Sequence, residues 1–143
     1  MRMVNYACAG AVLCLHAFVF LSPRLAWGHG ALAIGLPDSV ADHGIAMGVS
    51  WNMPNVEAAR KRALEECSGF QLAPVKTRAL CKVVRTFSRQ CVSFATDPKE
   101  GSPAWGWAVT KTLREAEMNA LRSCKGTMMD FCIVTVAQCD TTP

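Results

Sequence analysis

Motifs of the common metal and hydrolytic sites are missing from this sequence. There is no CxxC and no HxxxH spacing, and the chain has only three histidines, so the usual zinc sites are not expected. No GxSxG or HExxH motif and no paired-carboxylate signature occurs, so no hydrolase is indicated. With 143 residues, the chain is too short for a barrel enzyme or a large two-domain cleft. These absences favour one small binding domain.

No hydrophobic run is long enough for a clear membrane span. The apolar run near the start covers about 15 residues, whereas a spanning helix needs roughly 20. Arg2 precedes this run, and Ala26-Trp27-Gly28 follows it with small residues three and one positions before a possible cut. We therefore predict a secretory signal peptide over residues 1–28, followed by a single exported domain over residues 29–143 that begins at His29. An uncleaved membrane anchor is the alternative.

Export changes what the composition means. Cys8, Cys14 and two of the 15 basic residues lie within the leader, so the exported part keeps six of the 8 cysteines. It has 13 basic against 11 acidic residues, a net charge of +2. An even number of cysteines in an exported chain is typical of disulfide bonds. The small net charge does not indicate a nucleic-acid partner. We expect a secreted or periplasmic location, with no membrane anchor after cleavage.

The exported part contains an internal repeat at an offset of 57 residues. Each copy has a polar N-cap residue, small or apolar residues spaced by three and four, a cysteine, and a glycine two residues later. That spacing places one apolar face on a helix, and an N-cap side chain accepts a bond from an unpaired backbone N–H group. The matching pairs are Asn55 and Thr112, Ala59 and Ala116, Ala63 and Ala120, Cys67 and Cys124, and Gly69 and Gly126.

Strand-like segments surround the two helices in the order ββαβββαβ. This order predicts an α+β fold in which an antiparallel or mixed sheet carries both helices on one face. The first repeat is expected to span about residues 30–97 and the second about residues 103–140. Gly48 and Gly106 occupy equivalent strands and mark a close backbone approach or a bulge. The expected strand pairs are 31–36 with 45–51 and 82–87 with 91–96, and the second copy adds 105–109 and 131–138.

Six cysteines allow fifteen pairings, and the repeat narrows them because equivalent copies should pair in equivalent ways. The first choice ties each helix end to the next strand, with a third bond joining the two copies. The alternative links each helix to a later strand. The first choice is Cys67–Cys81, Cys124–Cys132 and Cys91–Cys139, and the alternative is Cys67–Cys91, Cys124–Cys139 and Cys81–Cys132.

Positive charge is concentrated between residues 60 and 89. This segment holds eight basic residues and two acidic ones, so it carries +6 while the rest of the exported part carries −4. Such an asymmetry suits an acidic protein or an anionic cell-envelope component as partner. The alternative is a solvated helix face beside a flexible loop. Lys82, Arg85 and Arg89 are the candidate contact residues.

Tryptophans form a second candidate contact surface. Trp105 and Trp107 alternate along a predicted strand and therefore share one face of it, and Trp51 lies in the equivalent strand of the first copy. On an exposed face these rings would stack on sugar rings or peptide side chains. The alternative is that they pack beneath the helices, since large aromatic residues supply much of the core of a small domain.

Histidine offers one metal hypothesis. An exported chain that begins at His29 can bind copper through its terminal amine and ring, and a second histidine would complete the site. His43 is the only other histidine of the exported part. We otherwise expect neither a metal nor a cofactor.

Several short sequence blocks of the exported part together follow a known pattern, which extends over nearly all of residues 30–139. The blocks are Gly48-x-Ser50-Trp51-Asn52, Ala63-Leu64-x-x-Cys67, Cys81-Lys82-Val83-Val84, Trp105-Gly106-Trp107 and Ala120-Leu121-x-x-Cys124. The pattern resembles a bacterial family of domains of unknown function, number 4189. The resemblance implies a small exported protein and brings no catalytic residues.

The function favoured by the sequence is therefore a non-enzymatic, disulfide-stabilised binding module outside the cytoplasm. Its partner would be a protein or an anionic cell-envelope component, bound through the basic segment or the tryptophan strand. Two alternatives stay open: a secreted effector or inhibitor acting on another cell, and a cell-envelope enzyme with a copper site at His29.

Overall fold

The computed structural model describes residues 28–124 and 131–140. The predicted leader apart from Gly28, with Cys8 and Cys14, lies outside the described residues, as does Gly126 of the repeat. Within these limits the protein is an α+β fold with two three-stranded antiparallel sheets, four helices and three disulfide bonds.

The first sheet is built from residues 29–87 and has the strand order β2-β1-β3. Because β1 lies in the centre, β2 and β3 form the two edges of this sheet. The short helix α1 follows β1, and α2 and α3 lie between β2 and β3 in the chain. Its elements are β1 (His29–Gly35), α1 (Val40–His43), β2 (Ala46–Met53), α2 (Val56–Ser68), α3 (Val75–Arg78) and β3 (Lys82–Phe87).

The second sheet uses the rest of the described chain in the same order of strand, strand, helix and strand. Its first strand, β4, is again central, and the strand order is β5-β4-β6. The edges are therefore β5 and β6. Its elements are β4 (Cys91–Thr96), β5 (Trp105–Thr110), α4 (Leu113–Cys124) and β6 (Ile133–Cys139).

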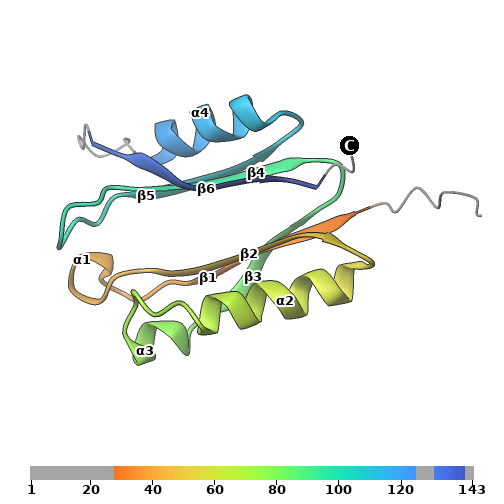
Figure 1. Ribbon diagram of the computed structural model, residues 1–143. Coiled ribbons are helices and arrows are strands. Elements are labelled where there is room, and N and C mark those ends of the chain that lie inside the picture. The colour runs from red at the N-terminus through yellow and green to blue at the C-terminus, as the bar shows by residue number, and fades with distance from the viewer. Residues whose placement is uncertain (1–27, 125–130, 141–143) are drawn as a thin grey trace, which may run out of the picture.

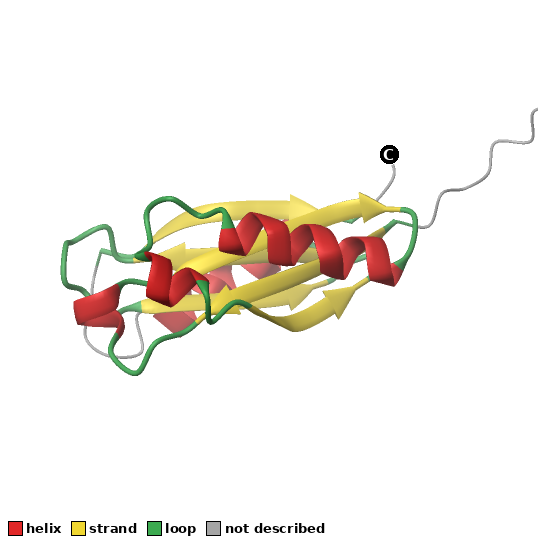
Figure 2. Ribbon diagram, turned by 90° about the horizontal axis from the view of Figure 1, so that it is seen from below, coloured by secondary structure: helices red, strands yellow, loops and turns green. Residues whose placement is uncertain are grey.

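The two sheets pack face to face, and each carries one long helix on its outer side (Figure 1). Helix α2 contacts β2 and β1, and helix α4 contacts β5 and β4. Figure 2 shows α2 lying over the outer face of its sheet. The expectation of one sheet with both helices on the same face is therefore wrong, because the helices cover two different sheets on opposite sides of the molecule.

Residue size along the central strands explains this layered arrangement. Successive side chains of a strand point to opposite faces. In β1, Ala31 packs beneath α2, whereas Leu32 and Ile34 pack between the sheets. In β4, Ala95 packs beneath α4 and Phe94 packs between the sheets. Each central strand thus buries both faces, and one helix and one sheet are needed to cover it.

The strand β4 belongs to the second sheet, which corrects the predicted pairing of residues 82–87 with 91–96. Strand β3 pairs with β1, while β4 pairs with β5 and β6. The chain passes between the sheets at residues 88–90, not between residues 97 and 103. Residues 82–87 and 91–96 are neighbours in the chain, but β4 is a central strand whose two edges are taken by β5 and β6, so no edge is left for β3.

The predicted N-caps of the two long helices are confirmed. The side-chain oxygen of Asn55 accepts a hydrogen bond from the N–H of Ala58 at 2.8 Å. The hydroxyl of Thr112 accepts one from the N–H of Glu115 at 3.3 Å. Both side chains satisfy an N–H group that has no partner within the first helical turn.

Close backbone approach, one of the two alternatives for Gly48 and Gly106, is what the structure shows. A methyl group at Gly48 would overlap the carbonyl of Ala63 on α2, and one at Gly106 would overlap the amide of Cys124 on α4. Each helix therefore lies directly on the backbone of the strand beneath it.

The three disulfides are those of the first predicted pairing. Cys67–Cys81 and Cys124–Cys132 each connect the last turn of a long helix to the residue before the sheet's third strand. Cys91–Cys139 connects β4 with β6, which are neighbours in the second sheet. The expectation that this third bond joins the two copies is wrong, because both of its strands belong to the second sheet.

Candidate functional site

A groove of about 690 Å³ lies along one side of the sandwich, between an edge strand of each sheet. Its volume falls within the range of about 300–1,000 Å³ that is common for binding sites. Strand β2 contributes residues 47–51 and Met53, and strand β6 contributes residues 135–138. Helix α2 and the turn after it provide the rest of the wall. We call this feature the edge groove.

The free edges of β2 and β6 border the edge groove, not only their faces. Successive residues in a strand point to opposite faces, so a lining that includes every residue of a run must follow the strand's edge. This is the case for residues 47–51 and 135–138. Within the described residues, β2 pairs only with β1, and β6 pairs only with β4. Residues 48–50 of β2 are buried and the N–H of Asn52 is bonded to Asp140, whereas residues 135–138 of β6 are exposed or half-buried, so β6 offers the more accessible backbone edge to a third strand.

Neither of these two edges carries a charged side chain. Residues 46–53 and 133–139 contain no Asp, Glu, Lys or Arg. Proteins commonly place charges, especially Lys, on exposed edges because these prevent pairing with other chains. The edge strand β3 follows that rule, since Lys82 and Arg85 are exposed on it. The β2 and β6 edges at the groove therefore lack the charged residues that hinder pairing of the β3 edge with other chains.

Apolar and polar side chains line the edge groove in nearly equal numbers, and the apolar ones include two aromatic rings. Trp51 is 39% exposed, and Met53 and Phe70 are half-buried. Arg62 and Glu66 of α2 also line it, and these two side chains form an ion pair. Because their charges offset each other, the wall formed by α2 adds no net charge to the groove.

A second hollow of about 640 Å³ continues the edge groove toward α1 and the β4–β5 loop. The two share Met47, Phe70 and Thr135, so they form one continuous depression. The lining of the second hollow includes three carboxylates but only one Lys or Arg side chain, Lys99. We call this part the acidic end. Its carboxylates are Asp42, Asp97 and Glu100.

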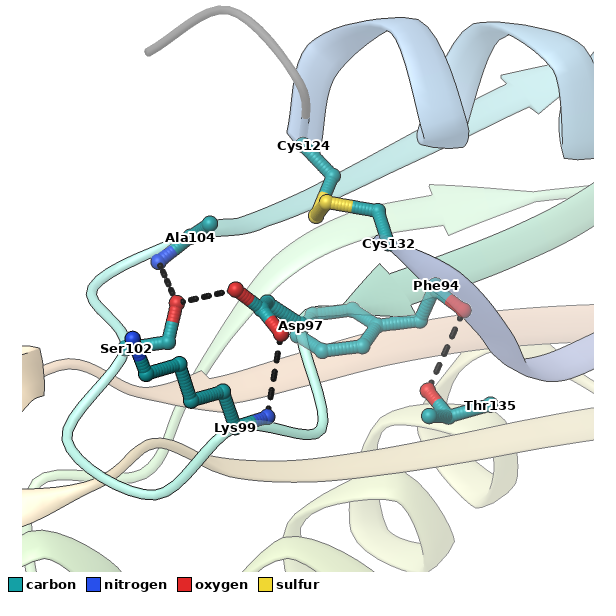
Figure 3. The surroundings of a disulfide bond; sticks show 8 residues. All are labelled: Phe94, Asp97, Lys99, Ser102, Ala104, Cys124, Cys132 and Thr135. Carbon is teal, nitrogen blue, oxygen red and sulfur yellow. Dashed lines mark hydrogen bonds between the residues drawn. A yellow bond between two sulfur atoms is a disulfide. The ribbon is translucent and has the colours of Figure 1, made fainter. Parts of the chain in front are cut away.

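Asp97 is the most buried carboxylate of the acidic end. It is 8% exposed, its Oδ1 accepts from the backbone N–H of Lys99 at 3.0 Å, and its Oδ2 accepts from the hydroxyl of Ser102 at 2.9 Å. Figure 3 shows these bonds closing the β4–β5 loop, beside the Thr135 hydroxyl that donates to the carbonyl of Phe94. The loop that forms this wall is thus fixed by its own hydrogen bonds.

The predicted basic contact residues do not line this groove. Lys82 and Arg85 are exposed on β3, and Arg89 lies in the connection between the sheets. Earlier in the basic segment, Lys61 and Arg62 form ion pairs with glutamates on the same helix, and Arg78 donates to the carbonyl of Ser68. The segment is therefore spread over α2, α3 and β3, partly neutralised along α2.

The predicted tryptophan surface is largely taken up by the protein's own core. Trp105 and Trp107 are half-buried and pack against the cluster between the two sheets. Trp105 also stacks on Phe94, with ring centroids 6.1 Å apart. The rings thus pack between sheets and not beneath a helix. Trp51, the third member of this set, is the one that faces the edge groove.

The two histidines of the copper hypothesis lie at opposite ends of β1. His29 begins this strand, and His43 ends α1, beyond its far end. Seven extended residues span about 20 Å, so the two rings cannot share one metal ion. The paired-histidine site is therefore wrong. In the described ranges there is also no group of three or more His, Cys, Asp or Glu side chains arranged to hold a metal.

Sequence reasoning missed the edge groove because its walls come from opposite sheets. The available signal was the absence of charge in residues 46–53 and 133–139. Recognising that signal required knowing that both segments are edge strands on the same side, which depends on the sheet order.

No helix in residues 28–124 or 131–140 has the length and hydrophobicity required to cross a membrane.

Comparison with protein families gives one match over most of the chain. Residues 29–139 match the family described as "Domain of unknown function (DUF4189)". Searches of curated proteins and of solved structures gave no match.

Proposed function

The chain belongs to the domain-of-unknown-function family 4189, and from this premise we propose that it is an exported binding module that takes up an extended segment of a partner protein. The segment would occupy the edge groove as an added strand. The observation that carries the proposal is that two open, uncharged strand edges border the same groove. Binding without catalysis is proposed, and no cofactor.

Export is supported by the leader pattern and by the cysteines. All six cysteines of residues 29–143 are in disulfides, and such bonds persist in secreted and periplasmic proteins. Each sheet has one bond that fastens its helix to its third strand. The groove is therefore built on a covalently stabilised scaffold, suited to work outside the cytoplasm.

The groove also indicates the chemistry of the bound segment. Strand addition supplies main-chain hydrogen bonds, and pockets for alternate side chains give specificity. Strand β6 has seven residues, or about 23 Å of edge, enough for a segment of similar length. Apolar or aromatic side chains would pack on Trp51 and Phe70. At the acidic end, a Lys or Arg of the segment would face Asp42 and Glu100.

Peptide selection on the exported, oxidised protein tests this proposal. We expect random decapeptides displayed on phage to yield binders with alternating apolar residues, few acidic residues and a basic residue at one end. Bound peptide should slow amide exchange in β2 or β6. Failure to select any binder, or binders rich in acidic residues, would contradict the proposed occupant.

A matched pair of variants locates the binding surface. Trp51→Lys places a charge at the edge groove, and Val84→Lys places the same charge on the exposed β3 edge, where Val84 is 38% exposed. Trp51→Lys should weaken the selected peptide at least about tenfold, since Trp residues dominate binding energy at interfaces, whereas Val84→Lys should leave affinity unchanged. The reverse pattern, together with loss on Arg85→Glu, would place the partner on the basic segment instead.

We also infer that the two sheets with their helices are pseudo-repeats of one unit. The support is the shared element order, the two glycines beneath the helices and the two helix-to-strand disulfides. In this interpretation the edge groove is formed by β2, the second strand of the first unit, and β6, the last strand of the second.

A further inference from the structure

Asp140 is a buried carboxylate with an incomplete set of partners. It follows β6, and its side chain is fully buried, with 0% exposure. Its Oδ1 accepts a hydrogen bond from the backbone N–H of Asn52 at 2.9 Å. Its Oδ2 has no hydrogen-bond partner among the described residues, although it is buried. A buried carboxylate oxygen is costly unless a donor or a positive charge compensates it.

The predicted processing point lies beside this carboxylate. Gly28 is buried beside Asp140, and a methyl group there would overlap Oδ1 of Asp140, the oxygen that accepts from Asn52, and would stand 3.0 Å from the carboxylate carbon. Two further oxygen atoms surround the same residue. The side-chain oxygen of Asn52 lies 3.1 Å from where a Cβ of Gly28 would stand, and the hydroxyl of Ser88 donates to the Gly28 carbonyl at 2.9 Å.

An ammonium group suits this set of acceptors. It carries three N–H donors, one positive charge and no acceptor. Asp140, Asn52 and Ser88 offer oxygen atoms around one small volume, and one of them carries a negative charge. An amide nitrogen at this point supplies a single donor and no charge, so it compensates the carboxylate less fully than an ammonium group.

We propose that Asp140 is the binding site for the terminal ammonium group of His29, which is created when the leader is removed. The inference rests on the proposed export of the chain. Hydrolysis of the Gly28–His29 peptide bond by a leader peptidase consumes one water, leaves a carboxylate on Gly28 and an amine on His29, and this amine takes up a proton at neutral pH. Departure of Gly28 opens the space beside Asp140 and releases the Ser88 hydroxyl.

The ion pair would connect both sheets to the new chain end. Asp140 follows the second sheet, and Asn52 and His29 belong to the first. Processing would therefore complete a contact between the sheets that the leader-bearing chain lacks. Its effect is that the processed protein is more stable than the precursor.

Four forms of the exported protein test the pairing through a double-mutant cycle. They start either at His29 or at a Ser-Gly extension before it, and carry either Asp140 or Asp140→Asn. With Asp140, the extension should lower the melting temperature by about 5 °C or more. With Asp140→Asn, the extension should change it little. Equal effects of the extension in both backgrounds would overturn the proposal.

Asp38→Asn, at an exposed site between β1 and α1, is the matched control and should show no coupling to the extension. Arg89→Gln is a further control, because Arg89 precedes Gln90, whose carbonyl accepts from the N–H of Asp140 at 2.8 Å. One outcome would assign Asp140 to Arg89 and not to the terminus. In it, Arg89→Gln lowers the melting temperature as much as Asp140→Asn does, and the Ser-Gly extension does not change it.

A second measurement needs no variant and so holds even if Asp140→Asn fails to fold. The His29 amine of the native protein should react with a succinimidyl ester at least about tenfold more slowly than the same amine in reduced, urea-unfolded protein, as read by peptide mass spectrometry. Equal rates would overturn the pairing. Terminal sequencing that shows a start far from His29 would overturn it as well, while peptide selection on the edge groove tests the proposed function independently.

Discussion

The hydroxyl of Ser50 donates to the carbonyl of Ala59 at 2.7 Å and accepts from the N–H of Ala31 at 3.1 Å. This one buried side chain therefore joins β2 to α2 and to β1. In the second sheet, Ser93 is equally buried and packed on the helix side, yet its hydroxyl has no partner among the described residues. The two serines give a natural test of what a buried hydroxyl contributes.

Ser50→Ala should lower the free energy of unfolding by about 1–3 kcal/mol, because it leaves the N–H of Ala31 and the carbonyl of Ala59 without their partner. Ser93→Ala should be neutral or stabilising by up to about 1 kcal/mol, because it removes an unsatisfied group. Urea unfolding of both variants measures the difference. A larger loss for Ser93→Ala would mean that its hydroxyl has a partner in solution.

Gly106→Ala should lower the free energy of unfolding by about 3 kcal/mol, because the added methyl group overlaps the backbone of α4. Gly48→Ala should lower the free energy of unfolding by a similar amount, because its methyl group would overlap the backbone of α2. The control is Gly69→Ala, since Gly69 is exposed and a methyl group there comes no closer than 3.1 Å to the Glu65 carbonyl. It should change stability by less than about 1 kcal/mol. Thermal unfolding of the three variants decides whether helix contact is the cause.

The disulfides should differ in their contribution according to the loop that each closes. In the chain-entropy model, separations of 8, 14 and 48 residues correspond to about 2.5, 3 and 4 kcal/mol. Paired Cys→Ala replacement should therefore cost most for Cys91–Cys139 and least for Cys124–Cys132. Urea unfolding of the three double variants gives the order. The reverse order would show that local packing outweighs chain entropy.

The tryptophans should separate into core and surface residues. Trp107→Ala should cost about 2 kcal/mol, since the ring packs between the sheets but is only half-buried. Trp51→Ala should cost less than about 0.5 kcal/mol, although it should weaken a bound peptide. Melting temperatures and peptide affinities of both variants provide the test. Equal stability losses would mean that Trp51 also supports the core.

Local features of this fold were predictable from sequence, whereas the partners of each strand were not. The caps Asn55 and Thr112 and the close-packed Gly48 and Gly106 depend on neighbouring residues or on the repeat. The choice among possible partners of β4 depends on how the two sheets pack and not on the strand's own residues, so the hairpin with residues 82–87 was a reasonable but wrong expectation. The alternation of Trp105 and Trp107 predicted a shared face but not what covers it.

The candidate site was less predictable than the fold, for the same physical reason. Basic residues such as Lys82 and Arg85 stand out in a sequence because they are charged. The edge groove is marked by residues that carry no charge and by two backbone edges, and neither attracts notice until the strand order is known. Trp51 was recognised only as the counterpart of two residues that proved to belong to the core.

Each of the three disulfides connects parts of a single sheet and its helix, one in the first half of the sandwich and two in the second. No cystine therefore joins the two halves. The only covalent connection between the halves, within the described chain, is the short segment of residues 88–90. Separation of the two halves would therefore break no disulfide, and reducing agent would not be needed for it. The cohesion of the halves rests on the apolar side chains packed between the sheets and on the bond from the Asn52 N–H to Asp140.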